Sequence, residues 1–265
     1  MPNAISTVAN IETYDYLSID SFARRYLNTY YLQIDPDELE IAKFLVEEYK
    51  KINGKPHMLE IGCGPTIHHV IPAVPYVSSI DMADYLSENL YQVKLWKDGI
   101  MSAHNWNHFT KKILELEGMS PSTQDIQTRE ALLKELMNGF YYCNVLKEKP
   151  LDQHKKYPII NFFYTAEEVA LNLSEWKKIM KRVSDILLPG GQLLLSALWE
   201  TDHYIIQKNG GYEKLPTARL NKIDMQTALF DLGFDMQKTI VKIAKTPSQA
   251  HQGINGVILV SAKKL

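Results

Sequence analysis

The chain has 265 residues, 45% of them hydrophobic, which is enough to bury one large core. A formal net charge of -2 provides no field that would attract nucleic acid or anionic lipid, so we expect neither as a partner. The first ten residues lack a secretory pattern, and no apolar run is long enough to span a bilayer. Two cysteines are too few for a disulfide framework or a thiolate metal site. We expect a cytoplasmic monomer with a small-molecule partner.

Aromatic and aliphatic residues at helical spacing mark the beginning of the chain. Phe22, Tyr26 and Tyr30 recur at helical intervals, and Pro36 is suited to the first turn of a second helix. These patterns predict that residues 1–53 form a helical amino-terminal cap.

A short apolar run, a glycine turn and a second apolar stretch follow, and they predict a strand, a tight turn and a helix. A polar and aromatic stretch at 91–138 predicts a helical insertion that serves as a lid. The predicted strands lie at 57–61, 76–82, 140–145, 157–164, 192–198, 236–244 and 256–262.

The clearest helical pattern precedes the fifth strand. Ser174 is the expected N-cap, and Pro189 with its neighbouring glycines is expected to end the helix. A last helix is predicted at 224–232. Alternating strands and helices favour parallel pairing with right-handed crossovers, and the last two strands favour an antiparallel edge. The sequence therefore predicts one α/β domain over 1–265, with a mostly parallel seven-stranded sheet and helices on both faces.

The turn after the first strand is suited to close contact with a ligand. Gly62 and Gly64 allow a sharp bend with backbone N–H groups facing the ligand. A dinucleotide site would need a third glycine where Ile67 stands, and Pro65 removes one donor. Glu60 instead suits a ligand with a positively charged amino-acid end, as in the E/D-x-G-x-G loops of methyltransferases.

An acid after the second strand is expected to accept the hydroxyls of a ribose. Asp84 lies 22 residues beyond Gly62, close to the roughly 20-residue spacing of such acids, and Asp81 is the alternative.

Four separated segments resemble the NNMT/PNMT/TEMT family of nicotinamide, phenylethanolamine and indolethylamine N-methyltransferases. The first two are distinctive of that family, and the last is widespread among methyltransferases. The resemblance implies a Rossmann-like class I methyltransferase fold and the cofactor S-adenosylmethionine, with S-adenosylhomocysteine as product. The segments are Tyr26-Leu27-x-x-Tyr30-Tyr31, Ile61–Thr66, Asp84–Leu90 and Leu187–Gly191.

The resemblance also implies which residues surround the cofactor. Tyr26 and Tyr31 would close over its methionine end, and Asp84 and Asn89 would hold the ribose. Asn144 replaces a family aspartate beside the adenine, where its amide oxygen can still accept a hydrogen bond. The expected set is Tyr26, Tyr31, Glu60, Gly62, Cys63, Gly64, Thr66, Asp84, Tyr85, Asn89, Asn144 and Val145.

The acids that hold acceptors in this family are replaced here by Ala166 and Ser196, so nicotinamide is not the expected acceptor. Glu167 is preferred as the acid that orients an amine and receives its proton, because Glu168 is expected to complete a capping box with Thr165. Tyr26 and Tyr204 complete the predicted catalytic set. Glu200 and Asp202 remain alternatives for contact with the acceptor.

No metal is expected. His104 and His108 are one helical turn apart, but the glutamate of a zincin motif and a third ligand are missing. His68 is either a neighbour of the cofactor or a polar helix position.

These residues predict an enzyme that transfers a methyl group from S-adenosylmethionine to a nitrogen of a small amine- or guanidine-bearing metabolite. Transfer to oxygen or sulfur, and binding of an adenosyl ligand without catalysis, remain alternatives.

Overall fold

The computed structural model describes residues 21–208 and 211–265, so the expectations for the first twenty residues lie outside it. One seven-stranded sheet has the order β3-β2-β1-β4-β5-β9-β8, and β6 and β7 form a separate hairpin. The elements are α2 (Phe22–Tyr30), α3 (Pro36–Tyr49), β1 (His57–Ile61), the 3-10 helix η2 (His68–Ala73), β2 (Ser79–Asp84), α4 (Ser87–Lys97), α5 (Asn107–Leu116), α6 (Thr123–Leu136), β3 (Met137–Tyr142), β4 (Tyr157–Phe162), α7 (Ala166–Val169), α8 (Leu173–Ile186), β5 (Leu187–Leu198), β6 (His203–Lys208), β7 (Gly211–Pro216), α9 (Lys222–Asp231), β8 (Ile240–Lys245), the 3-10 helix η3 (Pro247–Gln252) and β9 (Gly256–Lys263).

The predicted mostly parallel sheet is confirmed. Strands β1 to β5 pair in parallel, whereas β9 is antiparallel to both β5 and β8. Ile61 of β1 is level with Ala83 of β2 and Phe162 of β4. The carboxyl ends of these strands therefore lie side by side at one edge, where ligands of doubly wound sheets bind.

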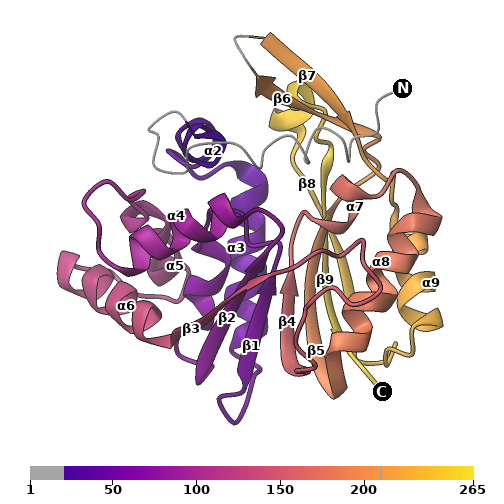
Figure 1. The fold of residues 1–265 in the computed structure, drawn as a ribbon, viewed down its shortest axis with the longest axis horizontal. Coiled ribbons are helices and arrows are strands. Elements are labelled where there is room, and N and C mark those ends of the chain that lie inside the picture. The colour runs from indigo at the N-terminus through magenta and orange to yellow at the C-terminus, as the bar shows by residue number, and fades with distance from the viewer. Residues whose placement is uncertain (1–20, 209–210) are drawn as a thin grey trace.

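Helices cover both faces of the sheet, with α3 to α6 on one side and α7 to α9 on the other (Figure 1). The alternation of side chains along a strand explains this arrangement. Met58 packs in the core that includes α3, whereas Leu59 and Ile61 pack in the core that includes α8. In the described part of the chain, no helix combines the length and the apolar composition needed to cross a bilayer.

Several predicted boundaries were displaced. The second strand begins at Ser79 rather than at 76. The third begins at Met137 rather than at 140, because α6 leads directly into β3. The segment after the glycine turn is a short 3-10 helix that contains Pro72, which has no N–H to continue an α-helix. The expected N-cap Ser174 lies inside α8, because Asn172 is the cap and accepts a hydrogen bond from the backbone of Glu175.

The hairpin of β6 and β7 was not predicted. Its strands pair antiparallel, with Tyr204 opposite Leu215. The sequence carried a signal, because an Asn-Gly dipeptide is typical of a hairpin turn and occurs at 209–210. Figure 1 shows this hairpin beyond the carboxyl edge of the sheet, on the same side as α2.

Asp81 is not available to a ribose. Its carboxylate is 1% exposed and accepts hydrogen bonds from Lys155 at 2.8 Å and from the Tyr157 hydroxyl at 2.7 Å, with His57 Nε2 at 2.8 Å. Burial opposes ionisation, but these partners hold the pKa of the Asp81 carboxyl below its ordinary value. Asp81 therefore joins β2 to β1 and β4 within the sheet.

We predict that Asp81→Asn lowers the free energy of unfolding by about 1–3 kcal/mol at pH 7, because buried partners lose a charged acceptor. Since the pKa of Asp81 is depressed in the folded state, its ionised form stabilises the fold above its unfolded pKa near 4, and this contribution disappears as the pH falls. Urea unfolding at pH 7 and pH 3 measures the difference, which should shrink at pH 3. An undiminished difference would contradict a charge-based role.

Candidate active site

A cavity of about 470 Å³ lies at the carboxyl edge of the sheet. Its volume is in the range of small-molecule sites. The segments that follow β1, β2, β3 and β4 line it, together with the end of β5, helix α2 and the β6–β7 hairpin. Chain segments far apart in sequence therefore converge on one pocket.

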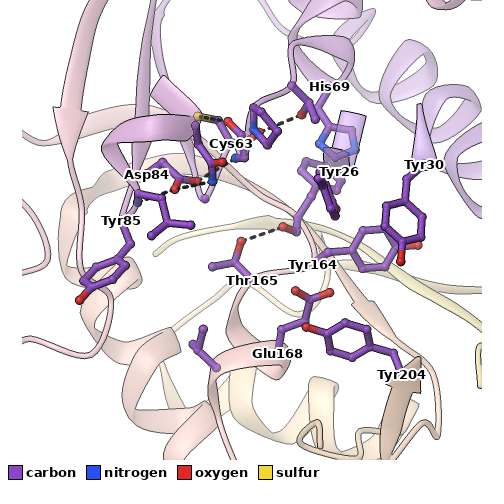
Figure 2. Close-up of a pocket in the computed structure, with 18 of the residues that line it drawn as sticks. Tyr26, Tyr30, Cys63, His69, Asp84, Tyr85, Tyr164, Thr165, Glu168 and Tyr204 are labelled. Atoms are coloured by element: carbon purple, nitrogen blue, oxygen red, sulfur yellow. Dashed lines mark hydrogen bonds between the residues drawn. The ribbon is translucent and has the colours of Figure 1, made fainter. Parts of the chain in front are cut away.

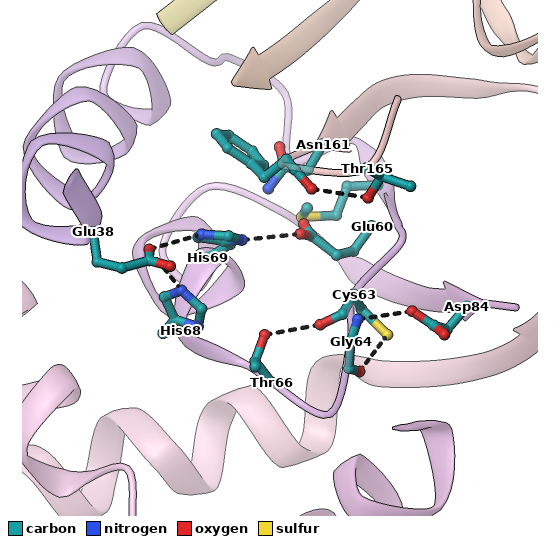
Figure 3. Close-up of polar contacts among 12 residues, drawn as sticks. Glu38, Glu60, Cys63, Gly64, Thr66, His68, His69, Asp84, Asn161 and Thr165 are labelled. Atoms are coloured by element: carbon teal, nitrogen blue, oxygen red, sulfur yellow. Dashed lines mark hydrogen bonds and ion pairs between the residues drawn. The ribbon is translucent and has the colours of Figure 1, made fainter. Parts of the chain in front are cut away.

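The glycine turn forms one wall and is held by Asp84. The Gly64 N–H donates to one carboxylate oxygen of Asp84 at 2.8 Å (Figure 3). The other oxygen accepts from the Leu86 N–H at 2.8 Å and the Asn89 amide at 2.9 Å. Burial raises the pKa of the Asp84 carboxyl despite these donors. One carboxylate thus joins the turn after β1 to the start of α4.

Most of the predicted cofactor residues line this cavity. The exception is Glu60, which was expected beside the cofactor but does not line the cavity. The residues that do line it are Tyr26, Tyr31, Gly62, Cys63, Gly64, Thr66, Asp84, Tyr85, Asn89, Asn144 and Val145.

Glu60 lies beneath the glycine turn instead of facing the cavity. Strand alternation places it on the same face of β1 as Met58, against α3, where it is 2% exposed. One of its carboxylate oxygens lies 3.5 Å from Nδ1 of His69. Glu60 therefore acts on the pocket through His69, which does line it.

A buried network of Glu38, His68 and His69 was not predicted. Nε2 of His68 lies 2.9 Å and Nε2 of His69 lies 3.2 Å from the same oxygen of Glu38 (Figure 3). Burial, followed by the charge of His69, lowers the pKa of His68 to about 4. Burial would also lower the pKa of His69, but Glu38 and Glu60 raise it to about 9. His69 therefore carries the proton at neutral pH, between two carboxylates.

The same three side chains are the described residues best placed to hold a metal ion. Glu38, His68 and His69 each offer one ligand atom, and these atoms lie within 4.8 Å of one another. Hydrogen bonds account for the contacts of both histidines with Glu38. His104 and His108, the pair considered in the sequence, line a separate surface pocket beside Arg24.

Of the two glutamates of α7, one is buried away from the cavity and the other lines it. Glu167 is fully buried, its carboxylate accepts from the Leu198 N–H at 3.0 Å, and it does not line the cavity. Glu168 lines the cavity. The expected capping box is absent, because the Thr165 hydroxyl donates to the Phe163 carbonyl at 2.9 Å instead. The sequence analysis preferred Glu167 to Glu168 as the acid that orients the amine, whereas Glu168 is the one of the two that lines the cavity.

Tyrosine rings surround the Glu168 side of the cavity (Figure 2). Tyr26 lies 5.0 Å from Tyr30, measured between ring centroids, and Tyr204 reaches the cavity from the hairpin. Burial, followed by the charge of Glu168, raises the pKa values of Tyr26 and Tyr204. These rings are neutral and can face a cation.

Other residues singled out in the sequence do not line the cavity. Ala166 and Ser196 are fully buried, and Asp202 contacts His203 on the exposed hairpin. Glu200 is also absent from the lining. No residue of 91–138 lines the cavity, because α5 and α6 pack against each other and against η2. That this segment serves as a lid stays a prediction.

Asp37 and Gln249 were missed by the sequence analysis. Asp37 lies in the first turn of α3 and Gln249 in η3, 212 residues apart, and the Gln249 amide donates to the Asp37 carboxylate at 2.7 Å. The Tyr164 hydroxyl donates to the other oxygen at 2.8 Å. Sequence order gives no hint of this contact, since it forms only when η3 folds back over α3.

A family model of the NNMT/PNMT/TEMT family matches residues 11–265. The indolethylamine N-methyltransferase of Mus musculus is 26% identical over 249 residues, which cover 90% of this chain and 91% of that protein. The phenylethanolamine N-methyltransferase of Bos taurus is 23% identical over 219 residues, which cover 78% of this chain and 72% of that protein.

Solved methyltransferases share the fold. The N-methyltransferase NodS from Bradyrhizobium japonicum WM9, in complex with S-adenosylhomocysteine, aligns with a TM-score of 0.52 at 10% identity over 97% of this chain and 98% of its own. A complex of DhpI with S-adenosylmethionine aligns with a TM-score of 0.59 at 10% identity over 99% and 98%. At such identities these structures establish only the class I methyltransferase fold. The family is shown by the family model: this chain belongs to the NNMT/PNMT/TEMT family.

Proposed function

We propose that this protein is an S-adenosylmethionine-dependent N-methyltransferase whose acceptor is a small cationic amine bound beside Glu168. Membership of the family supports the reaction. The observation that carries the acceptor class is a carboxylate in a tyrosine-lined pocket, with no lysine or arginine among the described residues of its lining.

The residues of the glycine turn fit an adenosyl ligand. Gly62 and Gly64 have φ angles of +66° and +57°, a left-handed backbone that glycine adopts without strain. The Oδ1 atom of Asn89 is buried, lies at the cavity wall and has no hydrogen-bond donor in residues 21–208 and 211–265. The Asp84 carboxylate accepts from the amide of the same Asn89, which leaves the Oδ1 atom of Asn89 as the acceptor for a ribose hydroxyl.

Gly62 can approach Thr165 this closely only because glycine has no side chain. A Cβ atom added at Gly62 would lie 2.0 Å from the Thr165 hydroxyl oxygen. The turn after β1 and the segment after β4 can therefore meet at the floor of the cavity only with glycine at this position. When bound, S-adenosylmethionine supplies an electrophilic methyl group on a sulfonium.

Glu168 is an acid without a partner among the described residues, and its surroundings suit a bound cation. No described residue donates a hydrogen bond or forms an ion pair with its carboxylate. Burial, followed by the charge of Glu167, raises the pKa of Glu168 well above its ordinary value. An ammonium group would restore the charged form, and the rings of Tyr26, Tyr30 and Tyr204 would contact its face.

The residues of the pocket mainly align and desolvate the reactants. Alignment of the nucleophile, methyl carbon and leaving sulfur can contribute about 7–11 kcal/mol of barrier reduction. Tyr26 and Tyr31 cover the cavity on the α2 side, with their ring centroids 5.6 Å apart, and exclude bulk water. The amine must also lose a proton before its lone pair can attack.

The proposed function is tested by incubating the full-length protein with deuterium-methyl cofactor and a panel of amines, phenols and thiols. We expect mass spectrometry to find the label on nitrogen of a cationic amine. Calorimetry should detect binding of S-adenosylhomocysteine. Label found only on oxygen or sulfur would overturn the acceptor class, and absence of adenosyl binding would overturn the whole proposal.

Gly62→Ala should weaken S-adenosylhomocysteine binding by at least roughly tenfold, because its Cβ collides with Thr165 at the cavity floor. The matched control is Gly54→Ala, which has a similar φ of +79° but nothing within 4 Å of the added Cβ. The control should lose only the roughly 1–2 kcal/mol of a left-handed alanine in folding free energy. Calorimetry on both variants measures binding, and equal affinities would contradict the proposed cradle.

Glu168→Gln should raise KM for the amine roughly 10- to 100-fold, equivalent to about 1.5–3 kcal/mol, because a charged hydrogen bond is lost. Glu167→Gln is the matched control one residue away. Its amide oxygen can still accept from the Leu198 N–H, so KM should change little. A larger effect on KM from Glu167→Gln than from Glu168→Gln would reject the assignment.

Amine binding should also depend on pH through Glu168. Since its pKa is raised in the free protein, ionisation on binding a cation releases a proton. Affinity should therefore rise as the pH approaches the raised pKa from below. Calorimetry of amine binding in two buffers with different ionisation enthalpies measures this release, which Glu168→Gln should abolish.

A further inference from the structure

Asp37 and Tyr164 form a pair of groups that the binding of the amine does not explain. Both line the cavity, and the Tyr164 hydroxyl donates to Asp37 at 2.8 Å. Figure 2 shows Tyr164 in the same part of the cavity as Glu168 and Tyr204, where the acceptor is proposed to bind. The pair therefore connects the acceptor side to helix α3.

Tyr164 is held in an unusual backbone conformation. Its φ is +48°, in the left-handed region that a bulky residue rarely adopts. Such a conformation is strained and persists where the surrounding structure holds it. It occurs two residues beyond the end of β4, at the ligand-binding edge of the sheet.

The surroundings of Asp37 raise the affinity of its carboxylate for a proton. Asp37 is 5% exposed and receives neutral hydrogen bonds from the Tyr164 hydroxyl, the Gln249 amide and the backbone of Glu38, and the described residues of the lining include no lysine or arginine. The described titratable groups that act on it are Glu38 of α3, Tyr31 just after α2 and Tyr164 itself. Burial, followed by the charge of Glu38, raises the pKa of Asp37 to about 6.

We propose that Tyr164 and Asp37 form a proton relay that deprotonates the amine acceptor before methyl transfer. This inference rests on the proposed function and adds the group that receives the proton. Glu168 binds the cation, and the relay prepares the nucleophile. Gln249 is a positioning residue that fixes the Asp37 carboxylate.

The relay conserves protons and charge. The ammonium N–H proton passes to the Tyr164 oxygen as the phenolic proton passes to the Asp37 carboxylate. The freed nitrogen lone pair forms the N–CH₃ bond, and the electron pair of the breaking S–CH₃ bond returns to sulfur, leaving a neutral thioether. The methylated nitrogen carries the positive charge, and Asp37 later releases its proton to solvent.

The relay predicts a characteristic pH profile. Asp37 must be ionised to accept a proton, so kcat should fall as the pH drops through about 6. Asp37→Asn should lower kcat roughly 100-fold at pH 7, a typical contribution of a positioned base, and remove this acidic limb. Tyr164→Phe, which deletes one oxygen atom, should do the same with the fold intact. Affinity for S-adenosylhomocysteine should stay unchanged in both variants.

The matched control is Asp231→Asn, an exposed residue of α9 whose carboxylate lies 3.5 Å from Lys177. It should keep both kcat and the acidic limb. A measurement without turnover complements the kinetics, because ¹³C NMR of aspartate carboxyl carbons in the S-adenosylhomocysteine complex should show one signal that titrates near pH 6 and is absent in Asp37→Asn.

The outcomes separate the two proposals. If the wild-type protein methylates an amine while Asp37→Asn and Tyr164→Phe keep kcat and the acidic limb, the relay is overturned and the function stands. If the wild-type protein methylates no amine, the proposed function fails, and the NMR titration alone does not rescue the relay.

Discussion

The cavity depends on the Asp84 carboxylate more than on any other single group. It gathers the N–H of Gly64, the N–H of Leu86 and the amide of Asn89, and so joins the turn after β1 to the start of α4. Donors from these two segments can converge on one buried acid because the parallel register ends β1 and β2 at the same level. The position of the ligand-binding wall is therefore set by sheet pairing and maintained by one side chain.

Negative charge around the cavity is managed in three different ways. The carboxylate of Glu38 is compensated by His69, which is charged because two acids surround it. The Asp37 carboxylate receives only neutral donors, and Glu168 has no partner among the described residues. These differences in partners explain why neighbouring acids can serve separate purposes, since each environment moves the pKa of its group differently. In the proposed mechanism, the paired acid Glu38 supports structure, the hydrogen-bonded acid Asp37 accepts a proton and Glu168 binds a cation.

The sheet and most of the predicted cofactor residues that line the cavity could be found from the sequence, because they depend on local signals. The short apolar run of β1, the Gly62 turn and the spacing to Asp84 are all readable within a short stretch of chain. The acceptor side could not be predicted in the same way. Whether Glu167 or Glu168 faces the cavity depends on the rotation of a four-residue helix, and a capping pattern suggested the wrong one. The partnership of Asp37 with Gln249 requires tertiary folding across 212 residues, which no local pattern encodes.

The hairpin of β6 and β7 pairs only with itself, outside the seven-stranded sheet, yet it contributes Tyr204, Ile205 and Leu215 to the cavity. Substitutions along this ribbon would alter the shape of the acceptor chamber while leaving the sheet register and the glycine turn untouched. Such a division lets the range of accepted molecules diverge among relatives at little cost to folding or to adenosyl binding. The β6–β7 hairpin is accordingly the region in which to redesign acceptor preference.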